Sequence, residues 1–143
     1  MRRRLALLGV LVLSLGPLGG ALWGQEPLAA AGERIRRAVL AHDASGIVAG
    51  SPGVTLRLPG ANPSAAVAPS QAAEVLRRHF QDAVERSAEL VAVREVEAGQ
   101  GFVDLVRRYV VRGTSEVRSE RMYVGLRAVG GGGWVVVEVR SGG

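Results

Sequence analysis

The chain has 143 residues, of which 48% are hydrophobic, 4% are aromatic and none is cysteine, and its formal net charge at pH 7 is +5. Leaving out the three consecutive arginines at positions 2–4 takes that charge from +5 to about +2, with the other arginines scattered among nearly as many acidic residues. A nucleic-acid interface needs a concentrated basic face with stacking aromatic side chains, so this composition argues against nucleic acid as a partner. The lack of cysteine excludes disulfide bonds and a lipoprotein anchor.

The first 24 residues have the pattern of a secretory signal. Three arginines, Arg2 to Arg4, precede an uncharged apolar run from Leu5 to Leu15. This order is typical of signal peptides, and the run is shorter than the roughly 20 apolar residues of a membrane-spanning helix. We therefore expect a signal peptide over residues 1–24, cleaved after Ala21 or Gly24, and one periplasmic or secreted domain over residues 25–143. The only membrane contact expected is through this segment, if it stays uncleaved.

The first part of this domain is predicted to hold two short helices and one or two short strands. Apolar residues recur at alternating four- and three-residue steps from Leu28 to His42, which predicts a helix, and Ile47 to Ala49 extends the pattern as one further turn. Val54 to Leu58 alternates apolar and polar residues, which predicts a half-buried strand, and Ala65 to Ala68 is a candidate second strand.

A longer amphipathic helix is predicted from Gln71 to about Arg86. Its apolar positions form one continuous stripe, as expected for a surface helix with one buried side. The stripe consists of Ala72, Val75, Leu76, His79, Phe80, Ala83 and Val84.

Four strand-like runs complete the chain, and short connections separate them. Because short connections favour hairpins, the runs should form an antiparallel meander with one buried face and one mixed face. The runs are Ala88–Val96, Phe102–Arg112, Val117–Val129 and Trp134–Arg140.

This order of elements is similar to that of the nuclear transport factor 2-like superfamily. The segment SQAAEVLRRHFQ, residues 70–81, followed by the meander, resembles small exported bacterial domains of unknown function with that fold. In that group the helix tends to end in two aromatic residues, where this chain has His79 and Phe80. The resemblance spans Ala31 to Arg140. It implies an α+β, cystatin-like fold: a cone-shaped, curved antiparallel sheet packed on the long helix, with a pocket at the open end.

The fold does not choose a function, because superfamily relatives include isomerases, dehydratases and many non-catalytic proteins. The candidate catalytic group is His79, which in a cone fold would face the pocket as a general base, with Asp82 or Asp104 as its carboxylate partner. The alternative is a buried histidine held by a single hydrogen bond, which is the commoner arrangement. His42 ends the first helix, where a cation suits the helix C-terminus.

The mixed face of the meander is the candidate ligand-binding surface. Its arginines and tyrosine would form a site for an anionic ligand, or alternatively a solvated face with cross-strand ion pairs. The candidates are Arg112, Arg121, Tyr123 and Arg127, with Glu138 and Arg140 nearby. No metal or other cofactor is expected, since a metal site needs three or four convergent ligands and the two histidines are far apart in sequence.

Together these features favour an exported, non-catalytic binding or assembly module with a small pocket, whose partner is a small ligand or a protein. The alternative is a small cofactor-free isomerase or lyase that uses His79. A third possibility is a homodimer through the mixed sheet face, which would bury Tyr123, Trp134 and Val136.

Overall fold

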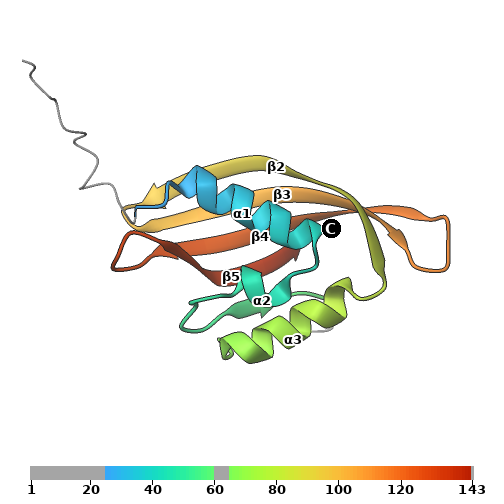
Figure 1. Ribbon diagram of the computed structural model, residues 1–143, viewed down its shortest axis with the longest axis horizontal. Helices are drawn as coiled ribbons and strands as arrows, with labels where there is room; N and C mark the ends of the chain where they lie inside the picture. Colours follow the sequence, from blue (N-terminus) through green and yellow to red (C-terminus); the bar gives the residue numbers. More distant parts are fainter. Residues whose placement is uncertain (1–24, 60–64, 143) are drawn as a thin grey trace, which may run out of the picture.

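The computed structural model describes residues 25–59 and 65–142 (Figure 1). The signal peptide expected over residues 1–24, with its cleavage after Ala21 or Gly24, lies outside these ranges. The two ranges contain no helix with the length and apolar character needed to cross a bilayer. The helices are α1 (Leu28–Leu40), α2 (Ala44–Ile47) and α3 (Pro69–Phe80), and the strands are β1 (Thr55–Arg57), β2 (Ala83–Glu97), β3 (Gln100–Val111), β4 (Val117–Ala128) and β5 (Trp134–Gly142).

The five strands form one curved sheet in the order β1-β5-β4-β3-β2. Strands β2 to β5 pair antiparallel with their sequence neighbours, which confirms the predicted meander. Strand β1 pairs parallel with β5 and forms the edge of the sheet opposite β2. The segment Ala65–Ala68, predicted as a second strand, contributes an isolated bridge in which Val67 exchanges two backbone hydrogen bonds with Val54.

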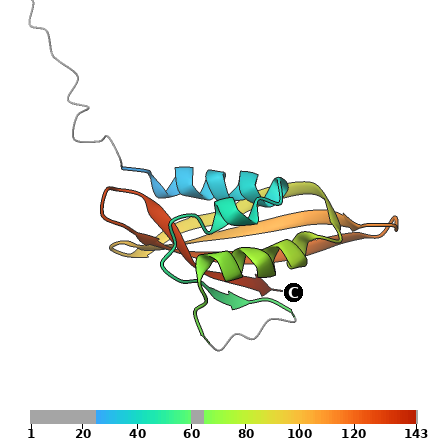
Figure 2. The same ribbon diagram turned by 60° about the horizontal axis from the view of Figure 1, so that its bottom comes forward.

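All three helices pack on one face of the sheet, as the apolar periodicity requires. Helix α1 runs over β2 and β3, and α2 and α3 lie toward β5 and β1 (Figures 1 and 2). Their apolar stripes meet the inward side chains of the strands in a single core. This core includes Ile35, Val39, Leu76, Phe80, Leu105, Met122, Val124 and Val139, all nearly inaccessible to solvent.

Helix α3 ends at Phe80, not near Arg86 as the apolar stripe suggested. Ala83 and Val84 instead begin β2, where they pair with Val111 and Val110 of β3. Their apolar side chains fit either a helical stripe or a strand. Pairing with β3 decides between the two, because it satisfies the backbone N–H and C=O groups along the β2 side of β3. Strand β2 therefore begins five residues earlier than predicted.

A bulge in β4–β5 changes the expected faces at the start of the last strand. Gly125 pairs with Glu138, but the next residue, Leu126, pairs with Val136, so one extra residue lies in β5 between these pairs. An extra residue moves every side chain beyond it to the other face. Val136, expected on the mixed face, is consequently in the core at 1% exposure and is not available to a dimer interface.

Candidate functional site

Five ionisable side chains meet in a largely buried cluster between the helices and the sheet. They come from five different elements: His42 directly follows α1, His79 lies in the last turn of α3, and Glu85, Arg107 and Glu120 lie on β2, β3 and β4. The guanidinium-bearing side chain of Arg107 is 1% exposed, and the side chains of Glu85 and Glu120 are 4% and 11% exposed. We call these five residues the buried ionic cluster.

Arg107 is the centre of the buried ionic cluster. Its Nε donates to Oε1 of Glu120 over 2.8 Å, and its Nη1 forms an ion pair with Glu85. Nε2 of His79 lies 2.9 Å from both carboxylate oxygens of Glu120, and Nε2 of His42 lies 3.0 Å from Oε1 of Glu85. The hydroxyl of Ser141 on β5 also donates to Glu120 over 3.0 Å. Each histidine is therefore held by a carboxylate that a buried arginine also binds.

The ring of Phe80 forms the apolar support of this cluster. The His42 ring stacks on it with the centroids 5.2 Å apart, and the His79 ring meets it edge-on at 5.6 Å. The guanidinium carbon of Arg107 lies 5.0 Å from the centroid of Phe80 and 4.2 Å from that of Tyr109, so cation–π attraction adds to the ion pairs.

His42 reaches Phe80 because α1 ends in a left-handed residue. The backbone φ of His42 is 52°, and Asp43 closes the helix end by donating its N–H to the carbonyl of Ala38 over 2.8 Å. Glycine is the usual residue at this position of a helix end. Stacking on Phe80 and the bond to Glu85 offset the strain of a histidine there.

The charge of Glu120 is strongly stabilised. Burial raises the pKa of its carboxyl, but hydrogen bonds and electrostatic interactions with His79 and Arg107 outweigh this effect and lower the pKa from 4.5 to about 2. Oε2 of Glu85 is buried without a hydrogen-bond partner in the described part of the chain. The other contacts of the cluster join its members to one another, as in a structural network.

The outer face of the sheet, away from the helices, carries a small open pocket of about 200 Å³. Phe102 and Tyr123 form its aromatic walls, and Gly125, Glu138 and Arg140 complete it. The guanidinium of Arg140 lies 4.9 Å from the Tyr123 ring centroid, and that of Arg121 lies 5.3 Å from the same ring. We call this site the Tyr123 pocket.

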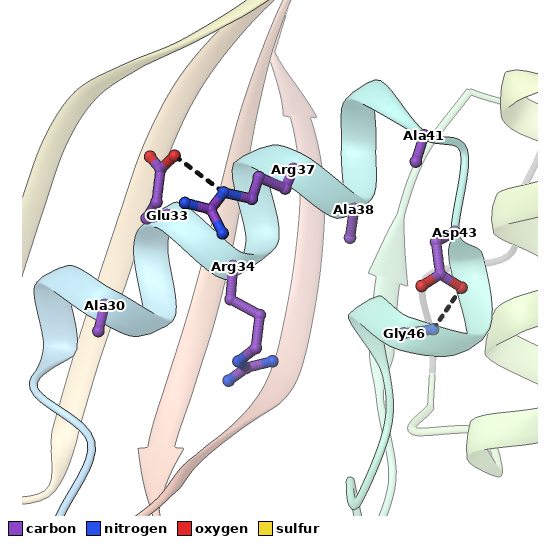
Figure 3. Close-up of a pocket in the computed structure, with 8 residues that line it drawn as sticks. All are labelled: Ala30, Glu33, Arg34, Arg37, Ala38, Ala41, Asp43 and Gly46. Carbon is purple, nitrogen blue, oxygen red and sulfur yellow. Dashed lines mark hydrogen bonds and ion pairs between the residues drawn. The ribbon is translucent and has the colours of Figure 1, made fainter.

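A wider groove of about 620 Å³ runs along α1 and α2 on the helical side (Figure 3). Its charged side chains bind one another or the helix ends. Arg37 pairs with Glu33 at 3.3 Å, Asp43 accepts from the N–H of Gly46 over 3.0 Å, and Arg34 pairs with Glu26 at 2.9 Å. These contacts stabilise α1, α2 and the turn between them.

Known structures share this arrangement of helices and sheet, although no family model and no curated protein matches the chain. A ketosteroid isomerase-like protein from Erwinia carotovora atroseptica is 21% identical, with a TM-score of 0.64 over 80% of this chain and 91% of that one. A DUF4783 family protein from Bacteroides ovatus is 13% identical, with a TM-score of 0.61 over 82% and 94% of the two chains. An NTF2-like protein of unknown function in nutrient uptake from Rhodospirillum rubrum is 19% identical, with a TM-score of 0.54 over 81% and 97%. The chain has the NTF2-like fold.

Within this NTF2-like fold, His79 faces inward as predicted, but its partner is Glu120 and not Asp82 or Asp104. Asp82 is exposed in the turn after α3, because the helix ends before it and the expected three-residue helical spacing does not apply. Asp104 is 3% exposed but accepts from Arg121 Nε over 2.9 Å, on the face of β3 that bears the Tyr123 pocket. Residues 25–59 and 65–142 contain no group of three or more His, Asp or Glu side chains placed to hold a metal ion.

The four predicted ligand-binding residues of the NTF2-like sheet do not all come together. Tyr123 lines the pocket and Arg121 lies against its ring, as the mixed-face pattern indicated. Arg112 is exposed beyond the end of β3, and Arg127 is exposed near the β4–β5 turn, so neither lines the pocket. Glu138 lies beside this site, as the alternation of the last strand indicated. Phe102 was missed, because it reaches the pocket only through the register of β3 with β4.

The charged members of the buried ionic cluster were also missed by sequence reasoning, although the sequence contains a signal for two of them. Arg107 continues the inward series of Val103 and Leu105, and Glu120 precedes the inward series that starts at Met122. A charge in phase with an apolar strand face indicates a buried, paired residue, since an unpaired one is very costly.

Proposed function

We propose that this protein is an exported, non-catalytic binding domain that holds a small ligand with an anionic group in the Tyr123 pocket. The observation that carries the proposal is the position of Arg140: its guanidinium lies on Tyr123 at the pocket and forms no ion pair within the described residues. Arginine presents several N–H donors in a planar fork that matches a carboxylate. An anionic group would therefore bind Arg140 while an apolar group lies between the aromatic walls.

The size of the pocket limits the ligand. Sites for drug-sized ligands have volumes of roughly 300–1,000 Å³, and the Tyr123 pocket has about 200 Å³. A ligand with one ring or one short aliphatic chain beside its anionic group fits this volume.

The buried ionic cluster supports a non-catalytic role. A general base needs a nitrogen within hydrogen-bond reach of a substrate proton. Nε2 of both histidines already lies within 3.0 Å of a carboxylate, and no hydrogen bond between the described residues joins His79 to Asp82 or Asp104. The described residues therefore contain no contact that supports an isomerase or lyase built on His79 with Asp82 or Asp104.

The binding proposal is tested by titrating the purified protein with 3-phenylpropionate and following backbone and arginine Nε–H signals by NMR. Saturable shifts are expected at Gly125, Glu138 and Arg140. The Arg140→Gln and Tyr123→Ala variants should each bind roughly tenfold more weakly, which is the change expected for loss of a charge-assisted contact or a ring face. Arg37→Gln, an exposed arginine on the helical side, should bind like the wild type. Shifts elsewhere, or none, would refute the proposal.

An assembly role would use the same sheet face differently, with a second copy covering Tyr123. Trp134 has little surface left for such an interface. Its indole N–H donates to the Glu26 carbonyl over 3.0 Å, and its ring packs against the core. Sedimentation velocity over a hundredfold concentration range separates the two roles. A concentration-independent monomer supports the ligand-binding role, and a dimer that Tyr123→Ala dissociates supports assembly.

Export is proposed from residues 1–24, whose arginines and apolar run have the pattern of a secretory signal. When a bacterial host expresses the full chain, the protein should be recovered outside the cytoplasm. Its mass should match a chain that begins at Leu22 or Gln25. Leu11→Arg places a charge in the apolar run and should leave the protein inside the cell. Equal export of both forms would contradict this.

A further inference from the structure

We infer that the ligand of the Tyr123 pocket is a zwitterion of the free amino-acid class, with its carboxylate at Arg140 and its ammonium at Glu138. This inference rests on the proposed binding function and adds the chemical class of the ligand. It follows from the pairing of opposite charges at the two ends of one small pocket.

Glu138 and Arg140 are two residues apart on β5 and on the same face, which separates their backbone positions by about 7 Å. Register places Arg140 beside Tyr123 and Glu138 beside Gly125 on β4. Neither hydrogen bond nor ion pair joins the two charges to each other across the described part of the protein. Glu138 does form one ion pair, with Arg57 at 3.6 Å, but this distance is too long for a hydrogen bond. The side chains of Arg57 and Glu138 are 57% and 38% exposed, so solvent weakens the pair. Glu138 is thus available to a second cation.

Gly125 keeps the floor between these charges open. A methyl group added there would lie 3.3 Å from Cβ of Glu138 and 3.9 Å from its Oε2. Phe102 pairs with Gly125 from the other side, and its ring forms the wall over this floor. The pocket therefore has a backbone floor, an aromatic wall on each side, and one charge of each sign at its edge.

This charge pattern discriminates against ligands that carry one charge. A simple anion gains the attraction of Arg140 but is repelled by Glu138, whose charge the weak pair with Arg57 only partly offsets. A simple amine is attracted by Glu138 and repelled by Arg140. The neighbouring pair of Asp104 and Arg121 is already satisfied and adds no net charge. A ligand with both charges gains both attractions, and its side chain lies against Phe102 and Tyr123.

The inference is tested with three probes that differ only in their charges: phenylalanine, 3-phenylpropionate and phenethylamine. NMR titration should give a dissociation constant for phenylalanine at least roughly tenfold below those of the other two, as one added charge-assisted contact predicts. Glu138→Gln should weaken phenylalanine binding by a similar factor and leave 3-phenylpropionate binding unchanged or stronger. Glu74→Gln, an exposed glutamate on α3, is the matched control and should change neither.

The outcomes separate this inference from the proposed function. If 3-phenylpropionate binds as tightly as phenylalanine and Glu138→Gln has no effect, the zwitterion inference is wrong while the binding function stands. If none of the three probes shifts the pocket signals, both are wrong. The variants change exposed side chains, and an unchanged amide spectrum outside the pocket confirms that they fold.

Discussion

Arg107 is the residue on which the interior of this protein depends most. Its side chain is almost fully buried and forms ion pairs with both Glu85 and Glu120, which lie on the two neighbouring strands. Removing one partner of a buried ion pair leaves the other charges uncompensated, which is far more costly than the net gain of forming the pair. Here the substitution of Arg107 would leave two buried carboxylates without their arginine partner.

We expect Arg107→Met, which keeps the length of the stem and removes the charge, to lower the free energy of unfolding by about 3–5 kcal/mol. The matched control is Arg108→Met, the next residue of the strand, which is exposed and should change stability by less than about 0.5 kcal/mol. Denaturant unfolding of both variants measures the difference. Equal stabilities would show that the cluster contributes nothing to folding.

At the scale of elements, close contact between α1 and the sheet depends on glycine at Gly101. A methyl group there would lie 2.7 Å from a Leu28 methyl carbon and 3.0 Å from the backbone oxygen of Arg94. Real Cβ atoms do not come this close to a methyl carbon, so the Leu28 side chain must move. The Arg94 carbonyl belongs to a paired strand and resists the shift of a few tenths of an ångström that the second contact requires.

Gly101→Ala should therefore destabilise the protein by about 1–3 kcal/mol, the usual cost of overpacking a close contact. Gly130→Ala is the control, because a methyl group there meets nothing within 4 Å and the residue lies in the β4–β5 turn. It should leave the melting temperature unchanged or slightly raised, as the alanine reduces the freedom of the unfolded chain. A melting temperature for Gly101→Ala equal to that of the control would contradict the packing argument.

At the scale of the whole molecule, the buried ionic cluster joins the end of α1, helix α3 and the three strands β2, β3 and β4, and Glu120 makes this connection sensitive to acid. The pKa of Glu120 in the folded state is about 2, below its ordinary value of 4.5. A carboxyl whose pKa is depressed by folding contributes stability that is fully present above pH 4.5 and is lost as the pH falls toward 2.

The difference in unfolding free energy between wild type and Glu120→Gln should accordingly shrink steadily as the pH falls from 4.5 to 2. Glutamine cannot ionise, so it removes this one titration while keeping the size of the side chain. Urea unfolding at a series of pH values measures the difference. A difference that stays constant down to pH 2 would show that Glu120 is not held in its charged form.

Local pattern was enough to determine most elements of this NTF2-like fold. The stripe on α1, the inward face of α3 and the meander of β2 to β5 follow from side-chain periods of 3.6 and 2 and from short connections, all of which relate residues near one another in the chain. His79 was placed on the inward face for the same reason. The pattern failed at Ala83 and Val84, whose apolar side chains suit a helix and a strand equally.

Only the tertiary structure decided which residues meet. His79 lies against Glu120, 41 residues further along the chain, because α3 packs on the face of the sheet toward which the Glu120 side chain of β4 points. Val136 faces the core because one extra residue in β5 shifts the alternation, and Glu138 and Arg140 flank a pocket because that shift brings them beside Gly125 and Tyr123. Helix ends, strand register and bulges are set by contacts between distant segments, so they are absent from any local pattern and appear only when the whole sheet is assembled.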